Sequence, residues 1–170
     1  MKNILFTLTL LVSFVSFGQT AMEYLNSAVD KDAANDFNGA IVDYTKAIEL
    51  LPELDINVAT AYNNRGNSKN ELKDYNGAIA DYTKAIKLDP NDADAYYNRG
   101  ISKKNLKDYN GAISDYTKAI GLNPNIASAY FNRGVAKAEL KDYNGAIADY
   151  TKELKEISKA IVNSKFFIII

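Results

Sequence analysis

The three arginines of the chain recur at a spacing of 34 residues, as Arg65, Arg99 and Arg133. A guanidinium group can hold an anionic ligand or form a two-pronged ion pair with a carboxylate. Aspartates also recur, at Asp43, Asp81 and Asp115, with spacings of 38 and 34 residues. We interpret these two sets of residues as structural ion pairs. Each arginine binds the aspartate of the preceding repeat: Arg65 binds Asp43, Arg99 binds Asp81 and Arg133 binds Asp115. The alternative is a basic stripe that binds an anionic ligand.

This pairing makes two further expectations about the ends of the columns. Ser27 occupies the position of the arginine in the first repeat. No repeat precedes the first one to supply an aspartate, so an arginine is not needed there. Asp149, at the other end, is expected to lack a partner.

Most side chains that perform catalysis or ligate metals are absent. The chain has no Cys and no His, so it lacks thiol nucleophiles, imidazole bases and Cys/His zinc sites. A glycine-rich phosphate loop is also missing. The acidic segment 89–94 lacks the glycine and the glutamate of a calcium-binding loop, since Asp94 and Gly100 stand in their places. We therefore predict a chain that is not an enzyme and has no metal, cofactor or small-molecule substrate.

Composition and charge are those of a globular protein. Of the 170 residues, 47% are hydrophobic and 24% are charged, and the formal net charge is −1. A chain without an excess of positive charge has no field that attracts a phosphate backbone. We therefore expect no nucleic-acid partner.

The first 18 residues have the pattern of a secretory signal peptide. Lys2 precedes an apolar run from Ile4 to Phe17, and Ser16 and Gly18 place small side chains before a cleavage point. The run is shorter than the roughly 20 residues that a transmembrane helix needs. We predict export to the periplasm or out of the cell, with an uncleaved membrane anchor as the alternative.

A 34-residue repeat occupies most of the remaining chain. The segments KDYNGAIADYTKAI, KDYNGAISDYTKAI and KDYNGAIADYTK begin at Lys73, Lys107 and Lys141. A looser copy begins at Asp36, and four extra residues around 53–57 separate it from the next, where we expect a longer loop. Fixed periods of this length are typical of stacked helical arrays. We predict an array over residues 19–163, with units at about 21–54, 59–92, 93–126 and 127–160.

Each unit has the spacing of two helices, because apolar residues lie three and four positions apart in both halves. Asn76 and Gly77 are expected to end the first helix and to begin the second, and Asp92 to cap the helix that follows. Gly66 is small where two helix axes approach closely. Leu72 and the tyrosines are expected to fill the space around it.

These residues resemble the signature of the tetratricopeptide repeat, which is W-x2-L-G-x2-Y, then A-x3-F, then P. In one unit the matching residues are Tyr62, Gly66, Ala78, Tyr82 and Pro90. The resemblance extends over about residues 20–160. It implies an all-α, right-handed superhelix of about four stacked helical hairpins, which binds proteins or peptides.

The resemblance also implies that one face of each first helix lines a concave groove, and the residues on that face vary between units. We predict that this face binds a protein or peptide, because amide side chains can bond a peptide backbone and aromatic rings can anchor its side chains. The predicted residues are Asn63, Asn67, Asn70, Tyr97, Ile101, Lys104, Phe131 and Val135. Two alternatives are open: Tyr97 and Phe131 pack between helices, or the array is a structural or self-associating spacer in an envelope assembly, with a homo-oligomer as its form.

The last helix is expected to run beyond the repeat, because apolar residues continue at steps of three and four as far as Ile161. Residues 164–170 then form an apolar tail. A truncated array and a tail docked on the last helices are its two explanations.

Overall fold

The computed structural model of the chain describes residues 20–52 and 55–166. Within these ranges every regular element is an α-helix, as the spacing predicted. The chain divides into two compact units, Met1–Pro90 and Asn91–Ile170. The expected signal peptide, and the tail beyond residue 166, lie outside the described residues.

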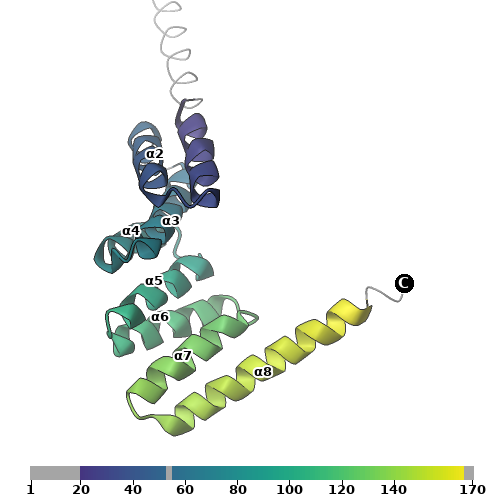
Figure 1. Ribbon diagram of the computed structural model, residues 1–170. Helices are drawn as coiled ribbons and strands as arrows, with labels where there is room; N and C mark the ends of the chain where they lie inside the picture. Colours follow the sequence, from purple (N-terminus) through teal and green to yellow (C-terminus); the bar gives the residue numbers. More distant parts are fainter. Residues whose placement is uncertain (1–19, 53–54, 167–170) are drawn as a thin grey trace, which may run out of the picture. The chain divides into compact units, whose positions relative to one another are not determined.

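The first unit contains helix 20–33, α2 (Phe37–Leu50), α3 (Ile56–Glu71) and α4 (Tyr75–Leu88), drawn from purple to teal in Figure 1. Helix α3 packs against both α2 and α4. Small residues and one tyrosine form a core between helix 20–33, α2 and α3: Ala28, Ala40, Tyr44 and Ala61. The unit is therefore two helical hairpins stacked in sequence order.

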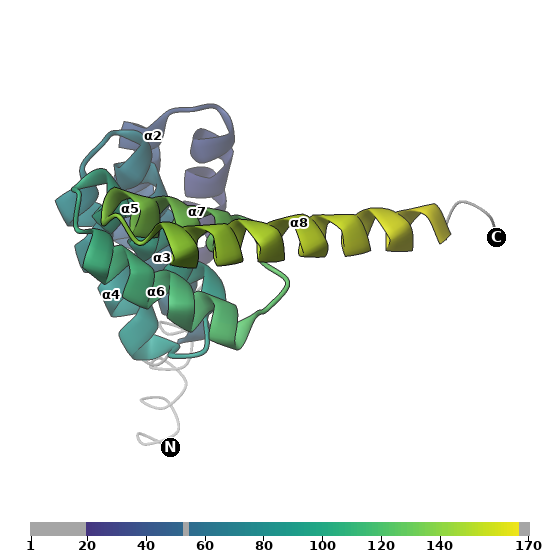
Figure 2. The same ribbon diagram turned by 90° about the horizontal axis from the view of Figure 1, so that it is seen from below.

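The second unit repeats this arrangement with α5 (Ala93–Asn105), α6 (Tyr109–Leu122), α7 (Ala127–Glu139) and α8 (Tyr143–Phe166). Each helix packs on the next along the chain. Helix α8 has 24 residues where α6 has 14, and it projects past α7 in Figure 2. The predicted long last helix is confirmed.

The turn inside each hairpin depends on an aspartate and not on the Asn–Gly pair. Lys73, which follows the C-cap of α3, adopts a positive φ of 63°. Asp74 then caps α4 by accepting a hydrogen bond of 3.0 Å from the backbone N–H of Gly77. A Cβ on Gly77 would lie 2.1 Å from the Asp74 carboxylate. The prediction that Asn76 and Gly77 break the helix is therefore wrong: both lie inside α4, and the glycine leaves room for the capping carboxylate.

The two helices of a hairpin cross where a glycine faces a tyrosine. A Cβ on Gly66 would lie 2.7 Å from the ring of Tyr82, which is 1% exposed. The close approach predicted at Gly66 is confirmed, and the same contact joins Gly100 to Tyr116. Leu72, by contrast, is 42% exposed and does not fill the core, because it lies at the C-cap of α3, beyond the packed turns.

The four extra residues between the first two repeats mainly lengthen a helix. Helix α3 begins at Ile56 and has 16 residues, against 13 for the first helices α5 and α7. The expected longer loop is therefore wrong in its main part, because the inserted residues add a turn to the start of α3.

Candidate functional site

Each arginine binds an aspartate of its own hairpin. Arg65 on α3 donates from Nε to Oδ2 of Asp81 at 2.8 Å and from Nη2 to Oδ1 at 2.7 Å. The pairs Arg99–Asp115 and Arg133–Asp149 have the same two-pronged geometry. The predicted pairing with the preceding repeat is wrong, because the crossing of the two helices in a hairpin brings positions 16 apart face to face. The prediction that Asp149 lacks a partner is wrong for the same reason.

A lysine column, which was not predicted, completes these ion pairs. Lys69 lies 2.7 Å from Oδ2 of Asp81, and Lys103 and Lys137 repeat the contact. The signal was present in the sequence, since each lysine follows an arginine by four residues and so shares its helix face. Burial alone would raise the pKa of Asp149, but hydrogen bonds from Arg133 and Lys137 lower it.

The first hairpin has its own version of the same cluster. Ser27 donates to Asp43 at 2.7 Å, and Lys31 forms an ion pair with the same carboxylate. The hydrogen bond from Lys31 lowers the pKa of Asp43 below its ordinary value. Ser27 is thus a partner of Asp43 and not the sign of a column that has no predecessor.

The arginines do reach the preceding hairpin, through a hydroxyl. Arg65 donates from Nη1 to Oγ1 of Thr45 on α2 at 2.9 Å, and Arg133 donates to Thr117 on α6 at 3.0 Å. One guanidinium therefore ties two helices of its own hairpin to the hairpin before it. These bonds account for the arginines as structural residues.

The amide-rich part of the predicted groove lies on α3. Asn63, Asn67 and Asn70 are half-buried there. The carbonyl oxygen of Asn67 accepts a hydrogen bond of 2.8 Å from the hydroxyl of Tyr82. In the hairpin before it, Asp32 accepts from Tyr44 at 2.9 Å. Asn67 is therefore partly structural, because it satisfies a buried hydroxyl.

The aromatic part of the predicted groove lies on α5 and α7. Phe131 is 45% exposed, while its ring centroid lies 5.7 Å from that of Tyr150. Tyr97 lies 5.9 Å from Tyr116 in the same way and is half-buried, as are Ile101 and Val135. Tyr97 and Phe131 thus pack on the second-helix tyrosines and still present part of their surface to solvent.

A lysine and an asparagine join α5 to α7 beside these rings. Lys104 donates to Oδ1 of Asn132 at 2.6 Å, and Asn132 donates to the hydroxyl of Tyr97 at 3.0 Å. Burial lowers the pKa of Lys104, and among the described residues it forms no ion pair. Asn132 was not predicted, although Asn64 and Asn98 precede it at the same spacing. The ammonium group of Lys104 is thus held by a neutral partner.

Tyr116 differs from Tyr82 in one respect. Its hydroxyl is buried and has no hydrogen-bond partner among the described residues. Ile101 occupies the position on α5 that Asn67 occupies on α3, so the amide oxygen that would accept the bond is missing. Burial raises the pKa of Tyr116 far above its ordinary value.

The described residues include no group of three or more acidic side chains placed to hold a metal ion. Over the same residues, no helix combines the length and the apolar character that crossing a bilayer requires. Two further aspartates that recur at the 34-residue spacing, Asp74 and Asp108, cap the second helices of their hairpins.

Models of the tetratricopeptide repeat match three stretches of the chain. A TPR repeat model matches residues 66–107, and two tetratricopeptide repeat models match residues 93–126 and 127–156. No curated protein sequence matches the chain. The matches run without a break from residue 66 to residue 156, which is more than half of the chain.

Solved structures share the same fold. A crystal structure of MamA is 25% identical, covers 84% of this chain and 81% of its own, and has a TM-score of 0.78. The TPR domain of Arabidopsis OM64 is 26% identical over 72% of this chain and 98% of its own, with a TM-score of 0.67. The second TPR of Spaghetti (RPAP3), bound to the HSP90 peptide SRMEEVD, is 31% identical over 56% of this chain and 89% of its own, with a TM-score of 0.56. These likenesses confirm the predicted all-α fold of stacked repeats.

Proposed function

The chain belongs to the tetratricopeptide repeat family, and from this premise we propose that it is a scaffold that binds a protein or peptide on the first-helix face of its hairpins. The peptide bound to the second TPR of Spaghetti supports this function for a fold that the chain shares. The proposal includes no catalytic step. Its partner is a polypeptide and not a nucleic acid.

One observation carries the proposal: a large apolar side chain is exposed on the varying face of the repeats. Phe131 is 45% exposed, and Val135 lies one turn further along α7, on the same side. With Tyr97 and Ile101 they form a surface that we call the apolar face. Exposed aromatic side chains of this kind are the usual anchors of a protein interface.

Polar groups on the first helices of the two units indicate what the partner carries. Lys104 is partly desolvated and has only a neutral hydrogen-bond partner, so a carboxylate of the partner would gain more there than in water. On α3, the oxygen of Asn67 is taken by Tyr82, so its amide N–H groups remain to donate to peptide carbonyls. We expect a peptide with an apolar side chain close to a carboxylate.

Selection from a random peptide library on the immobilised protein, followed by binding measurements on variants, tests this function. Phe131→Ala should weaken the selected peptides by about tenfold or more, as the loss of an interface anchor does. Tyr143→Ala is the matched control, because Tyr143 is 62% exposed but lies on the second helix α8. Loss of binding in the control and not in Phe131→Ala would refute the proposed face.

Self-association is the second candidate, and exposed apolar residues on α8 favour it. Ile147 is 62% exposed and Leu154 is 66% exposed, and Ile157 and Ile161 continue the same stripe. A second copy of the chain could cover this stripe, as the spacer hypothesis requires. Light scattering separates the two functions: a stable oligomer that Leu154→Lys dissociates favours the spacer, and a monomer favours the peptide-binding scaffold.

We propose that the protein acts outside the cytoplasm. The support is the sequence of residues 1–18 alone, whose basic start, apolar run and small residues before Gln19 fit a signal peptide. Mass spectrometry of the protein from cells should show a chain that begins at Gln19. A chain that retains the apolar run would favour the membrane anchor.

A further inference from the structure

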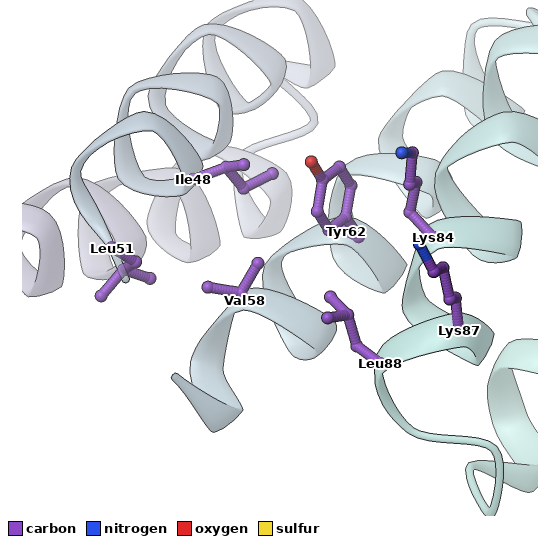
Figure 3. Close-up of a pocket in the computed structure, with 7 residues that line it drawn as sticks. All are labelled: Ile48, Leu51, Val58, Tyr62, Lys84, Lys87 and Leu88. Carbon is purple, nitrogen blue, oxygen red and sulfur yellow. The ribbon is translucent and has the colours of Figure 1, made fainter. Parts of the chain in front are cut away.

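The first unit contains a pocket where the inserted residues lengthen α3. It has a volume of about 290 Å³, close to the lower end of the range for small-molecule sites. Figure 3 shows its lining side chains, which come from the end of α2, the start of α3 and the end of α4: Ile48, Leu51, Val58, Tyr62, Lys84, Lys87 and Leu88. None of them belongs to the predicted peptide-binding face.

The pocket has an apolar floor and a positively charged side. Leu51 and Val58 are 8% and 3% exposed and belong to one buried cluster. Lys84 and Lys87 lie three residues apart on α4, so they share a helix face, and both are exposed. Within residues 20–52 and 55–166 neither lysine forms an ion pair. Among the described residues, no carboxylate therefore pairs with the two cationic groups beside this apolar recess.

The equivalent junction of the second unit does not have this character. The lysines recur there as Lys152 and Lys155, but Asn123 replaces Leu51 and Glu156 replaces Leu88. Glu156 follows Lys152 by four residues, so it brings a carboxylate to the same helix face, and it pairs with Lys159 at 3.8 Å. The first junction, where the insertion lies, therefore combines the two lysines with an apolar floor and with no acidic side chain among its lining residues.

The polar groups of the pocket limit what it can bind. Its lining side chains offer two ammonium groups and the hydroxyl of Tyr62, and no carbonyl or carboxylate. A peptide backbone brings several N–H donors, for which these side chains offer one acceptor, the hydroxyl of Tyr62, and an unsatisfied donor is costly. A carboxylate brings acceptors only, which is what ammonium groups require.

We propose that this pocket is a second binding site of the protein, for a small organic acid with an apolar chain. The chain lies against Leu51, Val58 and Leu88, and the carboxylate binds between Lys84 and Lys87. The ligand is not a substrate, since no group in the pocket could transform it. The site is independent of the peptide-binding face, so either can fail without the other.

An NMR titration of the full protein with sodium octanoate, below its micelle concentration, tests the site. The backbone amide signals of Leu51, Val58, Tyr62 and Leu88 should shift together and saturate. Replacing both Lys84 and Lys87 by Glu should weaken octanoate by about tenfold or more, because it removes two charge-assisted hydrogen bonds. The matched control, Lys152→Glu with Lys155→Glu, changes the equivalent lysines of the second unit and should leave the affinity unchanged.

Two further probes distinguish the acid from other ligands. Octylamine has the same chain with the opposite charge and should bind at least tenfold more weakly than octanoate. Shifts that do not saturate, or equal binding of octylamine, would overturn the proposal, since they indicate a non-specific apolar surface. A peptide of alternating Leu and Glu that shifts these signals where octanoate does not would also overturn it, since the pocket would then be a protein-docking surface.

Discussion

The hairpins α3–α4 and α5–α6 are close copies that differ at one position under a buried tyrosine. In the first, Tyr82 donates to Asn67; in the second, Ile101 replaces the asparagine and the hydroxyl of Tyr116 has no partner among the described residues. The second hairpin thus gives up a buried hydrogen bond and gains an apolar side chain on its first helix. Such a loss of local consistency is expected at functional sites. The comparison favours the apolar face of the second unit as the binding surface.

Each of the two hairpins has its own copy of the ion-pair cluster, and the loss of a cluster should have the largest effect on stability. Asp81→Ala leaves Arg65 and Lys69 without their carboxylate at a site where Asp81 is 4% exposed. We expect a loss of about 3 kcal/mol in the free energy of unfolding, because a buried charge loses its partner. Denaturant melts measure it, and Asp115→Ala should lose a similar amount. A much smaller loss in one hairpin would show that the clusters are not equivalent.

A double-mutant cycle checks the pairing within a hairpin. Arg65 and Asp81 should be coupled by more than about 1 kcal/mol, while Arg65 and Asp43 should show almost no coupling. The opposite result would restore the pairing with the preceding repeat.

The exchange Asn67→Ile converts the first hairpin to the pattern of the second and should have the next largest effect. It leaves the hydroxyl of Tyr82 buried without an acceptor, which should cost about 2 kcal/mol of unfolding free energy. Thermal melts of this variant against the unmodified chain measure the cost. Unchanged stability would show that the hydrogen bond from Tyr82 is unimportant.

Removing the hydroxyl of Tyr82 or of Tyr116 should change the free energy of unfolding by a smaller amount, which differs between the two hairpins. Tyr82→Phe deletes a satisfied hydroxyl and should cost about 1 kcal/mol, whereas Tyr116→Phe deletes an unsatisfied one and should be neutral or stabilising. The pair of melts is internally controlled, since the residues share position and burial. Equal losses would indicate that Tyr116 has a partner, such as a buried water.

The 34-residue period was sufficient to predict the hairpins, their packing glycines and the family. It could not assign Arg65 to Asp81 in place of Asp43, because both aspartates occupy the same position of the repeated segment and only the helix crossing distinguishes them. Nor could it show that Asn67 accepts a hydrogen bond from Tyr82. Asn67 varies between repeats on the first helix, whereas Tyr82 is a repeated residue of the second helix, and the spacing alone does not show that the two meet. The pocket could not be predicted either, because it depends on the residue at which α3 begins, and the spacing of apolar residues in a sequence does not define where a helix begins.

Acid should lower the folding stability of both units, because it protonates the carboxylates that form the ion pairs. The pKa values of Asp43 and Asp149 are lowered in the folded chain, so the folded state binds fewer protons than the unfolded one. Their contribution is complete above the ordinary pKa of 3.8 and is lost as the pH falls below it. Melting temperatures measured from pH 6 to about pH 2.5 should fall in that window. Replacing Asp43 by Asn should flatten the curve, and an unchanged curve would contradict the assignment.

The most direct test of the apolar face is Ile101→Asn, measured for stability and for peptide binding in the same preparation. The new amide should accept from Tyr116 and raise the unfolding free energy by about 1 kcal/mol. At the same time it should weaken the selected peptides, because it places a polar group on the apolar face. A variant that is more stable and still binds with unchanged affinity would contradict the account, since the isoleucine would then have no role in binding.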